Sequence, residues 1–164
     1  MIRKWLAAIL RDDTRDWPFT DSISYESIFD AANAEGVTGL LNERLNALNQ
    51  DSGIPSAFKE QLARLARTKA QQSLMREAEC RRILGCLQQA GIEALLLKGS
   101  ALAYWAYPSP HLRECSDIDL LFRSHAEAQK AIQLLQAMQY SLRDPALAGD
   151  LTSFEHTCVR NSDG

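Results

Sequence analysis

The sequence predicts an α+β protein in which a helical N-terminal part leads into a small α/β core with a mixed sheet. Three observations support this prediction. Apolar residues recur about every 3.6 positions through the first half of the chain, as on one face of a helix. The second half changes to short apolar runs bounded by turn residues, which are typical of strands. Helical stretches separate these runs, so helices and strands are expected to share one core.

The N-terminal part is expected to hold three short helices, which we place at residues 1–10, Ser24–Glu35 and Val37–Leu48. A much longer helix follows from Pro55, a residue that helices accept in their first turn, to about Ala90. It is either one helix or two stacked end to end, and Gly91 is expected to cap it. We therefore divide the chain into a helical region, 1–54, and a second region, 55–164, that contains the long helix and the core.

The core begins with an apolar run, Ile92–Leu97, which we interpret as a buried strand. A turn at Lys98–Ser100 and a short helix at Ala101–Tyr107 are expected next. Asp117–Phe122 is a second strand.

The rest of the core is a helix and two strand candidates. Ser124 and Glu127 have the spacing of a capping box, so a helix is expected from there to about Gln139. Tyr140–Arg143 and Thr152–Arg160 are the strand candidates. A turn-like segment follows the last of them, so we expect a return strand beyond residue 164. The core would then be incomplete, with an open sheet edge through which a homodimer could form.

Composition narrows the functional classes. The net charge of −3 and a pI of about 5.6 argue against a dedicated nucleic-acid binder, which normally has a basic face. A small anionic ligand is still compatible with this charge. No segment reaches the roughly 18 apolar residues of a membrane helix. The chain starts with a basic and then an apolar stretch, as a signal peptide would, but the apolar stretch is short and no cleavage-like segment follows, so we interpret it as an amphipathic helix. A cytoplasmic protein with no membrane partner is expected.

The four cysteines, Cys80, Cys86, Cys115 and Cys158, include no C-x-x-C pair, so neither a zinc ribbon nor a redox motif is present. We interpret them as free buried thiols.

Two features of the core indicate phosphate and metal chemistry. Gly99 and Ser100 stand between a predicted strand and a predicted helix. Glycine permits close approach of the backbone to a phosphate, and the hydroxyl and the N–H groups at the helix start can donate to its oxygens. Asp117 and Asp119 lie two residues apart in a predicted strand, so both carboxylates would project from one face. Like charges at that distance favour a shared cation, and Mg²⁺ prefers a few carboxylates together with substrate phosphates.

These residues resemble the signature of the DNA-polymerase-β-type nucleotidyltransferase superfamily, which is Gly-Ser, a short helix and Asp-hydrophobic-Asp. The fuller string, with Lys98, Tyr107-Pro108 and Arg113, resembles a bacterial nucleotidyltransferase branch of it. The resemblance covers roughly a fifth of the chain by motif. It implies a polymerase-β-like core, nucleotide binding by Lys98, Gly99, Ser100 and Arg113, and catalytic metal binding by Asp117 and Asp119 with Mg²⁺ or Mn²⁺.

The chain departs from the superfamily pattern in two respects. The interval from Ser100 to Asp117 is longer than in the smallest members. The superfamily also uses a third carboxylate on a later strand, which here is expected beyond the end of the chain, since Glu155 is a poor candidate for it.

The resemblance implies transfer of a nucleoside monophosphate from an NTP to an acceptor hydroxyl, with release of pyrophosphate. The sequence leaves the acceptor open, whether a small molecule, a protein or an RNA. The alternative is a catalytically inactive nucleotide-binding or protein-interaction module of the same fold.

Alternative interpretations stay open for several residues. Arg113 could instead pair with Glu114 or Asp117 at the surface. Two His-Cys pairs, His111 with Cys115 and His156 with Cys158, could ligate zinc, but two ligands fall short of the usual three or four, so incidental placement is favoured. The aromatic residues Tyr104, Trp105 and Tyr107 are interpreted as helix packing rather than as a platform for a base.

Overall fold

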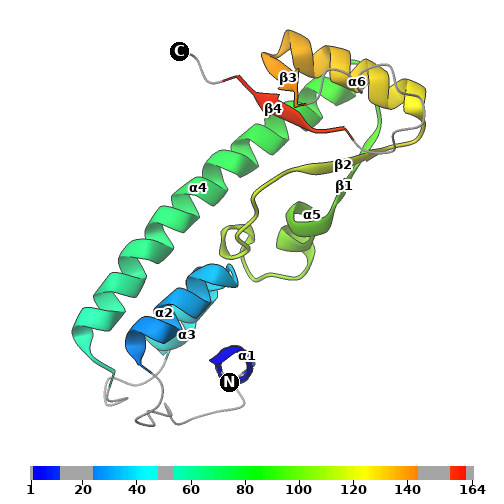
Figure 1. Cartoon of the computed structure of the whole chain (residues 1–164). Coiled ribbons are helices and arrows are strands. Elements are labelled where there is room, and N and C mark those ends of the chain that lie inside the picture. Colours follow the sequence, from blue (N-terminus) through cyan, green and yellow to red (C-terminus); the bar gives the residue numbers. More distant parts are fainter. Residues whose placement is uncertain (1, 12–23, 48–53, 144–155, 162–164) are drawn as a thin grey trace. The chain divides into compact units, whose positions relative to one another are not determined.

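The computed structural model describes residues 2–11, 24–47, 54–143 and 156–161 (Figure 1). The chain forms two compact units, and each contains two separate stretches of sequence. The first unit comprises Met1–Arg76 and Lys98–Ile118, and the second comprises Glu77–Leu97 and Asp119–Gly164. These two units are defined by contacts in space. The boundary expected after residue 54 concerned the order of elements along the chain, and it stays a prediction.

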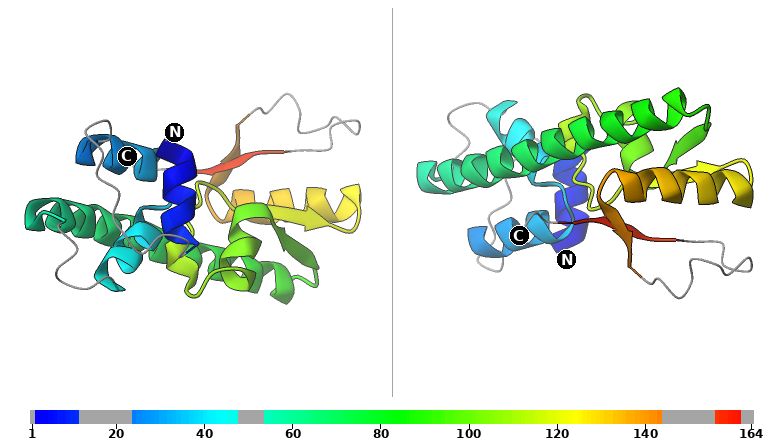
Figure 2. Two further views of the ribbon diagram at one scale, coloured as in Figure 1. Left: turned by 90° about the horizontal axis from the view of Figure 1, so that it is seen from below. Right: turned by 90° about the horizontal axis from the view of Figure 1, so that it is seen from above.

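The first unit is helical. Its N-terminal elements are α1 (Ile2–Leu10), α2 (Tyr25–Ala34) and α3 (Thr38–Ala47), which confirms the three short helices. Ser24 caps α2 because its hydroxyl accepts a hydrogen bond from the Ser27 N–H. Helix α1 contacts both α2 and α3 (Figure 2).

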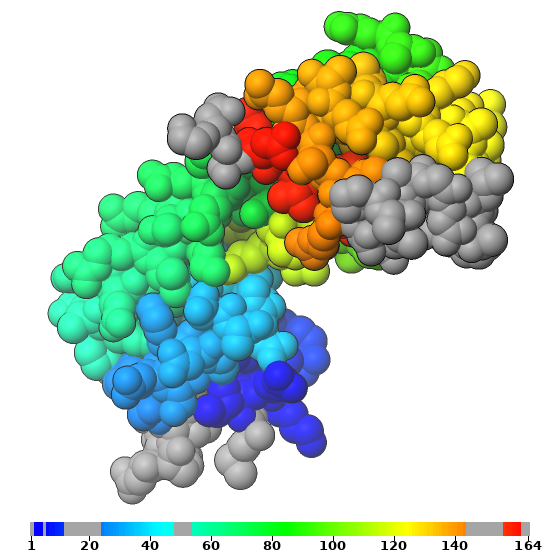
Figure 3. Space-filling model, turned by 45° about the horizontal axis from the view of Figure 1, so that its top comes forward, coloured from blue at the N-terminus to red at the C-terminus, as the bar shows by residue number. Residues whose placement is uncertain are grey.

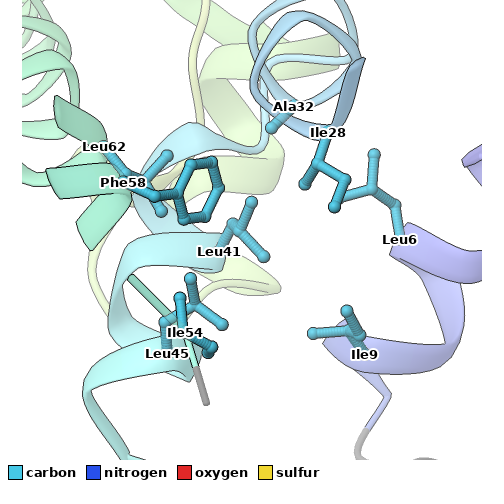
Figure 4. Packing of buried hydrophobic residues seen from close by; sticks show 9 residues of the cluster. All are labelled: Leu6, Ile9, Ile28, Ala32, Leu41, Leu45, Ile54, Phe58 and Leu62. Carbon is cyan, nitrogen blue, oxygen red and sulfur yellow. The ribbon is translucent and has the colours of Figure 1, made fainter. Parts of the chain in front are cut away.

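The apolar faces of these helices meet in one buried core (Figure 4). Ile28, Ala32 and Leu41 are completely buried, and α4 (Ser56–Gln89) contributes Phe58 and Leu62. The remaining members of this core are Leu6, Ile9, Leu45 and Ile54. The 3.6-residue period of the sequence thus places one apolar stripe of each helix in the interior.

Helix α4 is one continuous helix of 34 residues, which decides between the two arrangements that the sequence allowed. The chain passes from the first unit to the second within it, after Arg76. The helix ends at Gln89, and Gly91 follows as the predicted cap, with a φ of +70° that suits glycine. The next N–H, that of Ile92, then bonds back to the Leu87 carbonyl at 2.9 Å.

The second unit contains two antiparallel strand pairs among its described residues. Strand β1 (Ala94–Leu97) pairs with β2 (Asp119–Phe122), and β3 (Tyr140–Leu142) pairs with β4 (Cys158–Arg160). Strands β3 (orange) and β4 (red) lie side by side (Figure 3). The α+β class is confirmed, but these strands form two separate pairs in place of the single mixed sheet that was expected.

Helix α6 (His125–Ala137) contacts both β2 and β3. Its capping box is confirmed, because the Ser124 hydroxyl accepts from the Glu127 N–H at 3.2 Å. Residues 152–155 of the last expected strand, Thr152–Arg160, lie outside the described residues together with Glu155, as does the turn at 162–164.

The expectation of a buried first strand is wrong. Leu95 and Leu121 are partners across β1 and β2, and they are 61% and 53% exposed. A continuous apolar run signals a strand covered on both faces, whereas this run belongs to a two-stranded sheet with one face open. None of the helices in the described part of the chain has the length and apolar character that crossing a membrane requires.

Candidate nucleotide and metal site

The predicted phosphate-binding residues open a helix rather than a turn. Helix α5 spans Lys98–Trp105, so Gly99 and Ser100 lie in its first turn, and the turn expected at Lys98–Ser100 is wrong. The backbone turns into the helix at Lys98, whose φ of +49° lies in the left-handed region. The N–H groups of a first helical turn have no partner within the helix, so this end of α5 offers donors suited to an anion.

Ser100 connects α5 to the segment that carries the first aspartate. Its hydroxyl is buried and donates to the main-chain oxygen of Asp117 at 3.0 Å. Both residues belong to the first unit, so this contact fixes the backbone of Asp117 relative to the start of α5. Because the hydroxyl proton is engaged here, donation from Ser100 to a phosphate stays a prediction.

Gly99 lies against Cys115. A Cβ at position 99 would lie 3.1 Å from the Cys115 sulfur and 3.8 Å from Nη2 of Arg113. The first distance is shorter than an ordinary contact, so a side chain there would force its neighbours to move. The structure thereby brings together Gly99, Ser100, Arg113 and Asp117, four of the residues that the sequence singled out.

Arg113 does not pair with the neighbouring carboxylate. Its Nη1 donates to the main-chain oxygen of Glu114 at 3.1 Å, and its guanidinium lies 6.0 Å from the centroid of the Tyr107 ring. The Glu114 carboxylate is bound elsewhere, to the Thr38 N–H and to Lys69. The guanidinium charge is therefore not offset by Glu114, which suits a residue that meets phosphate.

The Cys115 thiol is held in its neutral form. Burial raises its pKa above the ordinary value, and the positive charges of Arg113 and Arg76 oppose this only in part. A thiol with a raised pKa is a poor nucleophile at neutral pH, so Cys115 serves as packing against Gly99. All four cysteines are free, as predicted, but only Cys80 is fully buried.

The two aspartates differ in their local structure. Strand β2 begins at Asp119, which is opposite Leu97 of β1, and Asp117 precedes it in a segment without regular secondary structure. The expected strand from Asp117 is therefore wrong at its first two residues, and the alternation of a strand does not orient Asp117. The backbone still restrains the pair, because Cα atoms two residues apart are at most about 7.6 Å from each other.

Other candidate residues group less closely. Among the residues that the structure describes, no cluster of three or more His, Cys, Asp or Glu side chains could hold a metal ion. The two His-Cys pairs therefore have no third ligand of this kind in the described ranges. Trp105 is 86% exposed, so its interpretation as helix packing is wrong.

The second unit has an open groove of about 820 Å³ between the end of α4 and the paired strands β1 and β2. Apolar side chains such as Leu87 and Phe122 line much of it, and Glu93 and Arg123, also in its lining, form an ion pair with each other. None of the predicted nucleotide-binding residues lines this groove.

Sequence reasoning missed the connections that hold these residues in place. Serine is common at helix starts, so nothing indicated that the Ser100 hydroxyl would bond to a carbonyl 17 residues away. Only one feature of the sequence pointed weakly to the packing of Cys115 on Gly99, namely the small size of Gly99 beside a predicted helix.

Together, the α+β fold, the Gly-Ser pair at a helix start and the Asp-x-Asp entry into a strand define a protein of the nucleotidyltransferase type. The model of the family described as "Uncharacterised nucleotidyltransferase" matches residues 21–162, and the chain belongs to this family. Comparisons with curated proteins and with solved structures found no match. The predicted membership of a nucleotidyltransferase family is confirmed, and the bacterial branch stays a prediction.

Proposed function

We propose that this protein is a metal-dependent nucleotidyltransferase that moves a nucleoside monophosphate from an NTP to an acceptor hydroxyl. In this reaction a bond forms between the acceptor oxygen and the α-phosphorus. The bond from the α-phosphorus to the bridging oxygen of the β-phosphate breaks, pyrophosphate leaves, and the hydroxyl proton is released. The observation that supports the proposal most strongly is the family match, which includes the whole segment from Gly99 to Asp119.

The donor set of the chain fits a magnesium ion. Asp117 and Asp119 supply two carboxylates, and Mg²⁺ in proteins is commonly held by one or two carboxylates together with substrate phosphates and water. We assign these two residues as the metal ligands. Bound Mg²⁺ or Mn²⁺ would neutralise charge on the triphosphate and polarise the acceptor oxygen.

The remaining residues bind and orient the substrate. We assign phosphate binding to the N–H groups of Gly99 and Ser100, which lie in the first turn of α5, because such groups can donate to phosphate oxygens. Arg113, whose neighbour Glu114 is engaged by Lys69, adds a fixed positive charge, and Lys98 adds a second one at the start of the helix. Catalysis by this site is then mainly positioning and charge neutralisation.

The test is transfer of label from an [α-³²P]NTP to acceptors drawn from small molecules, proteins and RNA, with pyrophosphate measured in parallel. The expected result is labelled acceptor and equimolar pyrophosphate, both dependent on Mg²⁺ or Mn²⁺ and lost in Asp119→Asn. Metal-dependent nucleotide binding without label or pyrophosphate for any acceptor would instead indicate the inactive nucleotide-binding module.

A further inference from the structure

Residues 113–118, which contain Arg113 and Asp117, have no helix or strand of their own to hold them. We call them the aspartate segment. A backbone without a hydrogen-bonded ladder takes its conformation from the contacts of its side chains and from isolated hydrogen bonds. The Ser100–Asp117 bond holds one end of the segment.

Glu114 makes the contacts that hold the other end of the aspartate segment. Its side chain is only 14% exposed, and Oε2 lies 3.1 Å from Nζ of Lys69 on α4. Oε1 accepts a hydrogen bond from the N–H of Thr38 at 3.2 Å. One carboxylate therefore bridges two helices that precede it by 45 and 76 positions, and all three residues belong to the first unit.

The contact with Thr38 stabilises the start of α3. Thr38 is the first residue of α3, and the N–H groups there have no partner within the helix. A carboxylate at this end satisfies one of them and interacts favourably with the positive end of the helix dipole. Thr38 is completely buried, so without Glu114 its N–H would lose a partner away from water.

The packing around Glu114 is close as well. A Cβ added at Gly36 would lie 3.4 Å from the Cβ of Glu114, and one added at Gly39 would lie 3.3 Å from Cδ2 of Leu112. The turn between α2 and α3 and the start of α3 thus lie directly against residues 112 and 114. This leaves the aspartate segment little room to shift.

We propose that Glu114 is a positioning residue for the proposed transfer reaction, acting through the backbone of the aspartate segment. Its carboxylate attaches the segment to α3 and α4, while Ser100 attaches it to α5. Glu114 does not touch the nucleotide, since both of its oxygens are engaged within the protein. Lys69 neutralises it, so the carboxylate does not cancel the charge that Arg113 presents to phosphate. This inference rests on the proposed function.

The test compares Glu114→Ala, Glu114→Gln and Lys69→Met with wild type. Glu60→Ala is the matched control, because Glu60 is an exposed carboxylate of α4 in the same unit, nine residues before Lys69 along the helix. Hydrogen–deuterium exchange of peptides covering residues 112–118 reports on the attachment. We expect at least tenfold faster exchange in Glu114→Ala and a smaller increase in Glu114→Gln, whose amide oxygen still accepts from Thr38. The control is expected to exchange like wild type.

A second readout separates positioning from general loss of folded protein. Titration with Mn²⁺ in the presence of a non-hydrolysable NTP should show about tenfold weaker metal binding in Glu114→Ala, the scale expected when a group that orients metal ligands is removed. Glu114→Gln should recover part of it. In the transfer assay the half-saturating metal concentration should rise to the same extent. Partial unfolding alone would lower the maximal rate and leave that concentration unchanged.

The outcomes separate this inference from the proposed function. Wild-type exchange and metal affinity in both Glu114 variants, or a lower maximal rate with an unchanged metal requirement, would overturn the positioning role. If wild type binds Mn²⁺ with the NTP but transfers nothing, the proposed function fails, and the exchange and Mn²⁺ titrations still decide the role of Glu114. No Mn²⁺ binding by wild type would overturn both.

Discussion

At the scale of single residues, the site depends on two contacts that bring chain segments close together. Gly99 leaves the space that the Cys115 sulfur fills, and Ser100 donates to the Asp117 carbonyl. Each contact joins the start of α5 to the aspartate segment, and each can be removed by one substitution without altering a proposed metal ligand.

The Gly99 contact predicts a destabilised variant that a second substitution repairs. Gly99→Ala should lower the free energy of unfolding by about 1–3 kcal/mol, the usual cost of overpacking. In Gly99→Ala/Cys115→Ala the sulfur that the new methyl meets is gone, so the loss relative to Cys115→Ala alone should be clearly smaller. Urea unfolding of the four proteins measures this coupling. Equal losses in both backgrounds would show that the sulfur does not set the limit at position 99.

Ser100→Ala separates two roles of one hydroxyl. If Ser100 positions Asp117, the variant should bind metal more weakly, and tri- and monophosphate nucleotides should lose affinity to a similar extent in the presence of metal. If the hydroxyl donates to the terminal phosphates, triphosphate binding alone should weaken, by about 1.5–3 kcal/mol for one hydrogen bond to a charged group. Calorimetric titration with an NTP analogue and with the NMP distinguishes the two. Unchanged affinity for metal and for both nucleotides would exclude both roles.

At the scale of elements, α4 is joined to the strand pair β3–β4 by a charged cluster on Glu79. Its carboxylate accepts hydrogen bonds from Arg82 and from the Tyr140 hydroxyl, and Nη1 of Arg160 lies 3.6 Å from it. The hydrogen bond from Arg82 is the main cause that lowers the pKa of Glu79 to about 2; burial opposes it, and Tyr140 reinforces it. Residues far apart in sequence thus hold the second unit together.

This depressed pKa gives the stability of the unit a defined pH dependence. The ionised carboxylate is the stabilising form, so its contribution is complete above the ordinary pKa of 4.5 and is lost as the pH falls towards about 2. Glu79→Gln should therefore lower the free energy of unfolding by about 1.5–3 kcal/mol at pH 7, and the difference from wild type should shrink between pH 4.5 and 2.5.

Unfolding curves across this pH range are the measurement. Glu77→Gln is the control, because Glu77 pairs with Arg81 along the surface of the same helix, a type of contact worth only about 0.3–0.5 kcal/mol. A difference between Glu79→Gln and wild type that is independent of pH would contradict the assignment.

The elements also show which features of the fold the sequence could predict. Period and capping signals located α2, α3, α4 and α6 to within about two residues, because local propensity and the core act in the same direction there. The strands were predicted too long and too buried. The apolar run before Lys98 is compatible with a strand that is covered on one face or on both faces. Only the tertiary context determines which of the two forms.

At the scale of the whole molecule, each unit is built from two stretches of the chain. The chain passes from one unit to the other three times, within α4, after Leu97 and after Ile118. Such a division cannot be seen in composition, since no linker-like stretch marks any of these points. Residue types and spacing singled out Gly99-Ser100 and Asp117-Asp119, which lie within the family match, and the roles of these residues stay a prediction. The anchoring by Glu114 and Ser100 was not predictable, because it joins residues up to 76 positions apart.

The first unit depends on its helical core as a whole. Leu41 is completely buried and belongs to this core. Leu41→Ala should lower the free energy of unfolding by about 2–5 kcal/mol. Because α3 also holds the aspartate segment through Thr38, hydrogen exchange in residues 112–118 should increase together with exchange in α3. Faster exchange in α3 without any change in residues 112–118 would show that the two are not coupled.

The central claim is that Asp117 and Asp119 bind a divalent metal together with a nucleotide. Calorimetric titration with a non-hydrolysable NTP, with and without Mg²⁺, tests it most directly in wild type, in Asp117→Asn/Asp119→Asn and in the control Asp30→Asn, which changes an exposed aspartate of α2. We predict Mg²⁺-dependent binding to wild type and to the control, and loss of that dependence in the double variant. Equal binding by all three proteins, unaffected by the metal, would contradict the account.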